Sequence, residues 1–162
     1  MFGRRKKVLV EAGAPAPSFR LIGLDQSAQT LEEILTGGPA LLAFYKISCP
    51  VCQLTAPYLQ RLAASNAIQV IGISQDEADA TRGFMQRFGV TFRTLLDLSR
   101  EEYPASNAYG ITSVPSVFLV ERDGTIARSF SGFSKHDFEA IGERAGVSPF
   151  GPDDQVPEWK AG

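Results

Sequence analysis

An apolar run that leads directly into two closely spaced cysteines constrains the fold of this chain more than any other feature. The run 40–45 has the composition of a strand that is buried on both faces. It is followed by Cys49-Pro50-Val51-Cys52 and then by a stretch of helical character over 53–65. This pattern predicts a strand and a helix that meet at the cysteine pair, an arrangement suited to a redox-active dithiol.

The position of the two cysteines on this helix predicts a different role for each. Cys49 at the helix start faces unpaired backbone N–H groups and the positive end of the helix dipole, and both favour its thiolate. Pro50 suits the first helical position, because its missing N–H costs nothing there. Cys52 lies on the same face, close enough to form a small disulfide with Cys49. We therefore predict that Cys49 is the nucleophile and Cys52 the resolving thiol of a redox-active disulfide.

A metal site is the main alternative use of a Cys-x-x-Cys pair. Zinc needs four ligands, and the pair supplies only two. The chain has no third cysteine and a single histidine, His136, so we expect no metal and no cofactor. Copper accepts two soft ligands, which leaves a copper-binding or redox-sensing module open as an alternative.

Composition and length predict one ordinary globular domain. The chain has 162 residues, of which 44% are hydrophobic and 21% are charged. A net charge of −2 gives no reason to expect a nucleic-acid partner. No apolar run approaches the roughly 20 residues that span a bilayer, so we expect no membrane span. We expect a monomer or a weak dimer.

The start of the chain leads to an expectation about location. Four of its first seven residues are basic, at 4–7, but the apolar stretch that follows them is only three residues long, at 8–10. A signal peptide needs a longer apolar segment at this place. We therefore expect a cytoplasmic protein, in which a cysteine pair is catalytic more often than structural.

The chain divides into three parts. Residues 1–12 form a basic leader, and 13–146 carry the alternating pattern of a folded domain. The stretch 147–162 has three prolines and no periodicity, so it is predicted to be a C-terminal tail that lies on the surface or is disordered.

Strand-like and helical segments alternate through the domain. Thr30 can cap a short helix with Glu33, and Ser134 can cap the last helix, in which Phe133 can contact Phe138. Ser74 or Asp76 is the expected cap of the helix that carries Phe84. Strands are predicted at 19–22, 40–45, 67–74, 91–96, 116–121 and 125–130, the last two joined by an Asp-Gly hairpin. The order predicts an α/β sandwich whose sheet is parallel in the middle with an antiparallel edge.

Several motifs together resemble a known family. Phe44-Tyr45 precedes Cys49-Pro50-Val51-Cys52, and Val114-Pro115 follows about sixty residues later, before a strand and an Asp-Gly hairpin. This combination resembles the thioredoxin fold. With the lead-in 14–21 and Tyr109-Gly110-Ile111, the chain is similar to the redoxin branch that includes alkyl hydroperoxide reductase/thiol-specific antioxidant proteins and TlpA-like thiol-disulfide oxidoreductases. The resemblance implies a three-layer sandwich, with a mixed central sheet flanked by helices and an N-terminal extension.

The resemblance also implies a second group of site residues. In the family, the proline at the position of Pro115 is cis, and the residue before it, here Val114, offers backbone hydrogen bonds to the substrate strand. Without the resemblance, Val-Pro would be read as an ordinary trans turn, because cis occurs in only about 5–6% of such bonds. Val114 and Pro115 are therefore the predicted substrate-binding residues.

The chain departs from the family at positions that matter for proton transfer. Many thioredoxins have a buried Asp where this chain has Ala43, and TlpA-like reductases often have a Glu where it has Thr55. A Trp that commonly precedes the first cysteine is replaced by Ser48. The proton acceptor of Cys52 is therefore unassigned, with Thr55 or a water as candidates.

Three further residues near the cysteines are candidate modulators. Lys46 can add positive potential that favours the Cys49 thiolate, although a solvated lysine at a strand end is an equally good interpretation. Pro50 and Val51 are the two residues between the cysteines.

These residues predict an enzyme, a thiol-disulfide oxidoreductase. Its partners would be a disulfide-containing protein or small molecule and a thiol reductant system. A thiol peroxidase is the alternative, but peroxide-reducing redoxins use Pro-x-x-x-Thr-x-x-Cys. Counting back from Cys49 gives Leu42 and Lys46, and from Cys52 it gives Tyr45 and Cys49, so neither cysteine fits that pattern.

Overall fold

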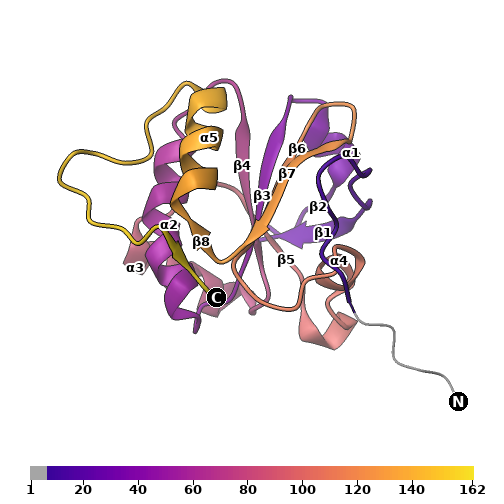
Figure 1. The fold of residues 1–162 in the computed structure, drawn as a ribbon. Helices are drawn as coiled ribbons and strands as arrows, with labels where there is room; N and C mark the ends of the chain where they lie inside the picture. Colours follow the sequence, from indigo (N-terminus) through magenta and orange to yellow (C-terminus); the bar gives the residue numbers. More distant parts are fainter. Residues whose placement is uncertain (1–6) are drawn as a thin grey trace, which may run out of the picture.

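The computed structural model describes residues 7–162, so the first six residues of the predicted basic leader lie outside the described part. The elements lie in the order β1 (Arg20–Gly23), β2 (Ala28–Thr30), α1 (Leu31–Leu35), β3 (Ala40–Tyr45), α2 (Pro50–Leu62), β4 (Gln69–Ser74), α3 (Ala78–Phe88), β5 (Thr94–Leu96), the 3-10 helix η1 (Ser99–Glu101), α4 (Pro104–Ala108), β6 (Ser116–Val120), β7 (Ile126–Ser131), β8 (Phe133–Ser134), α5 (Lys135–Ala145) and β9 (Trp159–Lys160) (Figure 1).

One mixed sheet organises these elements, with strand order β2-β1-β5-β4-β3-β6-β7. The central strands β3, β4 and β5 run parallel. β6 pairs antiparallel with β3, and β1 pairs antiparallel with β5, so the sheet has antiparallel pairs on both sides of its parallel centre. The predicted α/β sandwich with a mixed central sheet is confirmed. The second antiparallel side, formed by β1 and β2, was not predicted.

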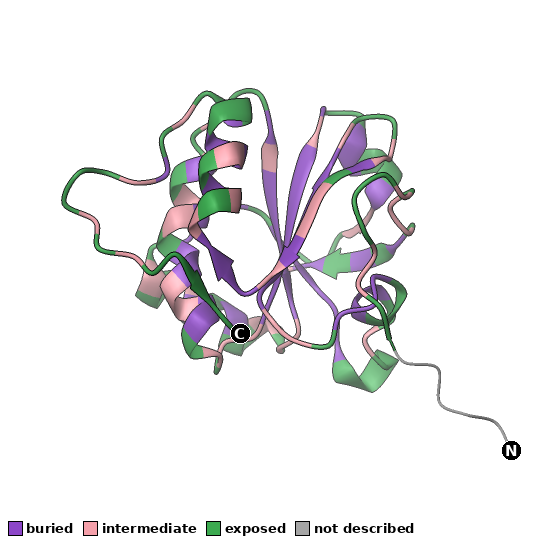
Figure 2. Cartoon of the chain, in the orientation of Figure 1, coloured by how far each residue is buried: buried purple, intermediate pink, exposed green. Residues whose placement is uncertain are grey.

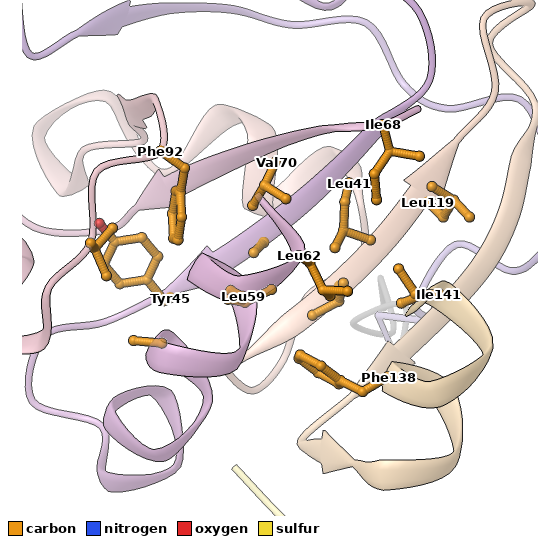
Figure 3. Close-up of a cluster of buried hydrophobic side chains, with 14 of the residues drawn as sticks. Leu41, Tyr45, Leu59, Leu62, Ile68, Val70, Phe92, Leu119, Phe138 and Ile141 are labelled. Carbon is orange, nitrogen blue, oxygen red and sulfur yellow. The ribbon is translucent and has the colours of Figure 1, made fainter. Parts of the chain in front are cut away.

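Helices cover both faces of the sheet, which gives the three layers of the fold (Figure 1). β3 is buried along its whole length, because its alternate side chains enter two different cores. Leu41 and Tyr45 point into a core formed with α2, α3 and α5 (Figure 3). Leu42 and Phe44 enter the second core, which includes α1 and residues around α4. Figure 2 shows the resulting buried centre between exposed helix faces.

Two predicted helix starts are confirmed by their caps. The Thr30 hydroxyl accepts a hydrogen bond from Glu33 N at 3.1 Å, and the Ser134 hydroxyl accepts one from Asp137 N at 3.2 Å. The rings of Phe133 and Phe138 stack with centroids 5.5 Å apart across the second start. These caps were predictable because each depends on residues three to five positions apart.

The start of α3 differs from the prediction. Its N-cap residue is Glu77, which makes no side-chain cap. Ser74 is the last residue of β4, and its hydroxyl lies 2.7 Å from the hydroxyl of Thr81 in α3. Asp76 accepts a hydrogen bond from Ile47 N at 2.8 Å. Both predicted caps are therefore used in contacts between elements rather than at the end of the helix.

Both ends of the described chain are attached to the domain. Val10 N donates to Tyr109 O at 3.1 Å, and the Ser129 hydroxyl donates to Val10 O at 2.7 Å. In the stretch 147–162, Phe150 contacts the aromatic rings of Tyr58, Phe133 and Phe138. This stretch lacks periodicity in sequence, yet it has defined contacts, since its partners lie in α2, β8 and α5.

Within residues 7–162, no helix combines the length and the apolar composition required to cross a bilayer.

A glycine in the middle of the sheet provides a test of this packing. A Cβ at Gly72 would lie 2.8 Å from Thr94 Oγ1 and 2.9 Å from a Phe92 ring carbon. We expect Gly72→Ala to lower the free energy of unfolding by about 1–3 kcal/mol, because the packed ring must move. Urea denaturation would measure the change.

The matched control is Gly83→Ala in α3. A Cβ at Gly83 meets no atom within 4 Å, and helical alanine is favoured over glycine. This substitution should stabilise the protein by about 0.5–1 kcal/mol. Equal effects of the two substitutions would contradict the described packing around Gly72.

Candidate active site

The sulfur of Cys49 acts as the N-terminal cap of α2. Cys49 has an extended backbone, with φ −84° and ψ 116°, and Pro50 is the first helical residue. Its Sγ accepts a hydrogen bond from Cys52 N at 3.2 Å, which is the role that a serine or aspartate oxygen usually fills at this position. A backbone donor and the helix start therefore stabilise negative charge on this sulfur.

The same sulfur contacts a segment that is distant in sequence. The Cys49 thiol donates a hydrogen bond to Val114 O at 3.3 Å, and the Val114–Pro115 peptide bond is cis. Pro115 directly precedes β6, whose first residue, Ser116, is paired with Phe44 of β3. The end of β3 and the beginning of β6 thus lie at the same edge of the sheet, which brings Val114 and Pro115 to Cys49.

The two cysteines, both free thiols in this structure, lie in different environments. Cys49 is partly exposed, whereas Cys52 is 2% exposed. Burial raises the pKa of the Cys52 thiol well above its ordinary range. Its hydrogen bond with Cys49 and the negative charges of Cys49 and Asp76 raise that pKa further, and a backbone hydrogen bond with Lys46 opposes them. Cys52 is therefore held as a neutral thiol behind Cys49.

A small cavity borders Cys52 and the candidate proton acceptors. It measures about 10 Å³ and is lined by Ala43, Tyr45, Thr55 and Pro115 among others. A volume of this size approaches the space that one water requires. The fully buried Thr55 hydroxyl donates to Val51 O at 2.6 Å, so only its oxygen lone pairs remain for another partner. Thr55, one of the two candidates from the sequence, thus lines a cavity beside Cys52.

The structure places the three candidate modulators in different ways. Lys46 is tied to the site through its backbone, since Lys46 O accepts a hydrogen bond from Cys49 N at 3.3 Å. Pro50 is exposed at the helix start, and Val51 is buried, with its carbonyl bonded to Thr55.

Asp76 and Tyr45 are site neighbours that sequence reasoning did not assign to the site. Asp76 fixes the segment before the cysteines through its hydrogen bond from Ile47 N. The Tyr45 hydroxyl is buried without a hydrogen-bond partner, and burial raises the pKa of Tyr45 to about 12. An acidic residue just after a buried parallel strand is the signal that points to Asp76, because the carboxyl ends of such strands share one edge.

The part of the chain that the structure describes contains no group of three or more His, Cys, Asp and Glu side chains able to hold a metal ion.

Comparison with known proteins gives a consistent result. The family model of Redoxin matches residues 11–143. The thiol-disulfide oxidoreductase ResA of Geobacillus thermodenitrificans is 26% identical over 139 residues, which cover 83% of this chain and 78% of ResA. The thiol:disulfide interchange protein DsbE of Yersinia pestis is 28% identical over 123 residues, which cover 74% of this chain and 64% of DsbE.

A solved structure shows the same fold. The thioredoxin domain of a thiol-disulfide oxidoreductase from Bacteroides vulgatus superposes with a TM-score of 0.73. The match covers 84% of this chain and 99% of that domain at 18% sequence identity, so it is evidence for the fold alone.

The expected cytoplasmic location is wrong. The related ResA and DsbE proteins are extracytoplasmic, either membrane-anchored or periplasmic. The expectation rested on the short apolar stretch at 8–10 and on the lack of an apolar run long enough to span a bilayer. A Cys-x-x-Cys dithiol functions in oxidising and reducing compartments alike, so the pair carries no information about location.

The difference in exposure predicts which thiol reacts first. With limiting iodoacetamide near neutral pH, we expect the reduced protein to be alkylated at Cys49, because Cys52 is buried and held as a neutral thiol. Mass spectrometry of the digested protein would locate the label. Preferential labelling of Cys52 would reverse the two roles.

The raised pKa of Cys52 also predicts a pH dependence of stability. Below its ordinary value of 9.0, the folded and unfolded chains both keep this thiol protonated, and the stability is fully present. Above that pH only the unfolded chain releases the proton, so stability falls as the pH rises. Between pH 9 and 10, the free energy of unfolding of the reduced protein should fall by about 1 kcal/mol more than that of Cys52→Ala.

Denaturant titrations at the two pH values, with a reductant present, would measure this difference. The buried phenol groups of Tyr45 and Tyr109 are common to both proteins, so their contributions cancel in the comparison. Parallel pH dependences of the parent and the Cys52→Ala variant would contradict it.

Proposed function

The chain belongs to the Redoxin family, and we propose that it exchanges electrons with disulfide substrates through the Cys49–Cys52 dithiol. It is a thiol-disulfide oxidoreductase of the thioredoxin fold, as its relatives indicate. One observation carries the assignment of roles. Cys49 Sγ is partly exposed at the start of α2, with Cys52 buried directly behind it and Val114 beside it.

The reaction has two steps that together move two electrons. The Cys49 thiolate attacks one sulfur of a substrate disulfide, a Cys49–substrate disulfide forms, and the second substrate sulfur leaves as a thiolate. Cys52 then loses its proton and attacks Cys49 Sγ, which releases the other substrate sulfur and forms the Cys49–Cys52 disulfide. The substrate is reduced and the dithiol is oxidised. A thiol reductant restores the dithiol, or the same steps run in reverse in an oxidising compartment.

Proton release from Cys52 is the demanding part of the second step, because burial favours the neutral thiol. The cavity beside Cys52 offers the route. A water in it would lie near the Thr55 hydroxyl, whose own proton is engaged by Val51 O. When the mixed disulfide forms, Cys49 no longer carries negative charge, which removes one cause of the raised pKa of Cys52. Cys52 therefore loses its proton more readily in the mixed disulfide, the state in which it must attack Cys49 Sγ.

Val114 provides a docking point for the substrate backbone. In the reduced protein its carbonyl accepts the hydrogen bond of the Cys49 thiol. A Cys49 thiolate or mixed disulfide has no proton to donate, so Val114 O becomes free for an N–H of the substrate. Pro115 has no N–H of its own, and its carbonyl already accepts a hydrogen bond from Gly132 N at 2.8 Å, so the backbone of Val114 is the part of this loop that a substrate can use.

The proposed partners follow from this chemistry. They are a disulfide-containing protein or small molecule and a thiol reductant system. The proposed domain spans 13–146, with Pro50 and Val51 setting the helix start and Lys46 acting through its backbone carbonyl.

Insulin reduction by dithiothreitol, run beside a hydrogen peroxide consumption assay, tests the proposal. We expect catalysed insulin reduction and little peroxide consumption. Cys49→Ser should return insulin reduction to the uncatalysed rate, because the attacking sulfur is lost. Cys52→Ser should accumulate the Cys49–substrate disulfide, since the resolving thiol is missing.

The control is His136→Ala, an exposed position in the first turn of α5, which should leave the rate unchanged. Rapid peroxide consumption through Cys49 would favour the peroxidase alternative. Stoichiometric copper binding without insulin reduction would favour a metal-binding module.

A further inference from the structure

The last residues of the chain lie across the loop that contains Val114 and Pro115, where we propose that the substrate backbone docks. β9 pairs antiparallel with β8, with Phe133 opposite Lys160 and Ser134 opposite Trp159. Lys135 N donates to Glu158 O at 3.0 Å, which extends this pairing by one residue. Figure 1 shows the strand running beside β8 towards the lower end of the molecule. We refer to residues 158–162 as the closing segment.

The closing segment ends against Val114. A Cβ at Gly162 would lie 1.9 Å from Val114 O and 3.1 Å from Pro115 Cδ, so the backbone there approaches too closely for any side chain. A Cβ at Gly132 would lie 2.4 Å from Lys160 O, which is a second close approach of the same segment. The carbonyl that Gly162 covers is the one that accepts the Cys49 hydrogen bond.

The closing segment is attached weakly, whereas the stretch before it is anchored. Its strand pairing involves two residue pairs, and its Glu158 side chain is 84% exposed, so the 3.6 Å ion pair with Lys135 contributes little. Trp159 is 61% exposed. In contrast, Phe150 packs on three aromatic rings, and Arg61 pairs with Asp154. Residues 158–162 can therefore lift from the domain while 147–157 stay in place.

We propose that the closing segment determines substrate specificity by occupying the place of a substrate strand beside Val114. This inference rests on the proposed function of Cys49 and Val114. A protein disulfide, whose flanking backbone must lie along the loop, displaces the segment before it reacts. A small disulfide needs only the partly exposed sulfur of Cys49 and reacts with the segment in place. The apparent affinity for protein substrates is then reduced by the fraction of molecules in the open state.

Two variants and two substrates test this proposal. Lys160→Pro removes the backbone N–H of an exposed strand residue, and deletion of 158–162 removes the whole segment. If the closing segment covers the loop in about ten of every eleven molecules, either change should raise kcat/KM for insulin about ten-fold. The value for 2-hydroxyethyl disulfide should change less than about two-fold, since this substrate does not need the open state.

Lys160→Ala is the matched control, because it removes the same side chain and keeps the backbone. It should behave like the parent with both substrates. Urea denaturation of each variant would show that the domain remains folded, as expected from the exposed position of residues 158–162.

Fluorescence gives an independent measurement, because Trp159 is the only tryptophan of the chain. In the Cys52→Ser background, a disulfide formed between Cys49 and a cysteine peptide should lower the fluorescence anisotropy of Trp159. The same disulfide formed with 2-mercaptoethanol should leave the anisotropy unchanged.

The outcomes separate this inference from the function on which it rests. Unchanged or lower insulin turnover in both segment variants would overturn the proposal, as would an equal gain with both substrates, which indicates that the segment blocks Cys49 itself. A parent protein that reduces neither substrate would instead overturn the proposed function.

Discussion

The pairing of β6 with β3 is the constraint on which the site depends. β3 is buried on both faces, so its position in the sheet is fixed by two cores at once. Its antiparallel partner β6 begins where β3 ends, with Ser116 opposite Phe44. Residues that follow β3 and residues that precede β6 must therefore meet. The contact between Cys49 and Val114, 65 positions apart, is a direct consequence.

Where β3 and β6 meet, a cysteine sulfur caps a helix, a role that a side-chain oxygen usually has. Cys49 Sγ caps α2 by accepting from Cys52 N, so the hydrogen bond that begins the helix is also the one that stabilises charge on the sulfur. The second cysteine has the opposite environment, because burial is the largest cause of its raised pKa. The chain has no acidic residue at positions 43 and 55. Asp76, in the loop after β4, lies near the site instead and accepts the hydrogen bond of Ile47 N. The small cavity beside Cys52, lined by Ala43 and Thr55 among others, is the proposed place for proton transfer.

Access to the site depends on a segment outside β3, the two cysteines and α2. The stretch 147–162 runs back over α5 and α2, is anchored by Phe150, and ends at the Val114–Pro115 loop. Because residues 147–157 are anchored and the closing segment 158–162 is held by a short strand pair, the closing segment can move while 147–157 stay in place. In this arrangement the discrimination between protein and small disulfides is separate from the chemistry of the sulfurs, and each can change without the other.

The sequence by itself determined those features that depend on neighbouring residues. The strand 40–45, the helix start at the cysteines and the caps by Thr30 and Ser134 are encoded within a few positions, so propensity and capping chemistry were sufficient. The cis bond before Pro115 was expected from family resemblance alone. Only the tertiary structure decided the second antiparallel side of the sheet, the use of Asp76 to hold Ile47 and the path of residues 147–162. Each of these depends on contacts between segments far apart in sequence, and no local period or motif records which distant partner a backbone group will find.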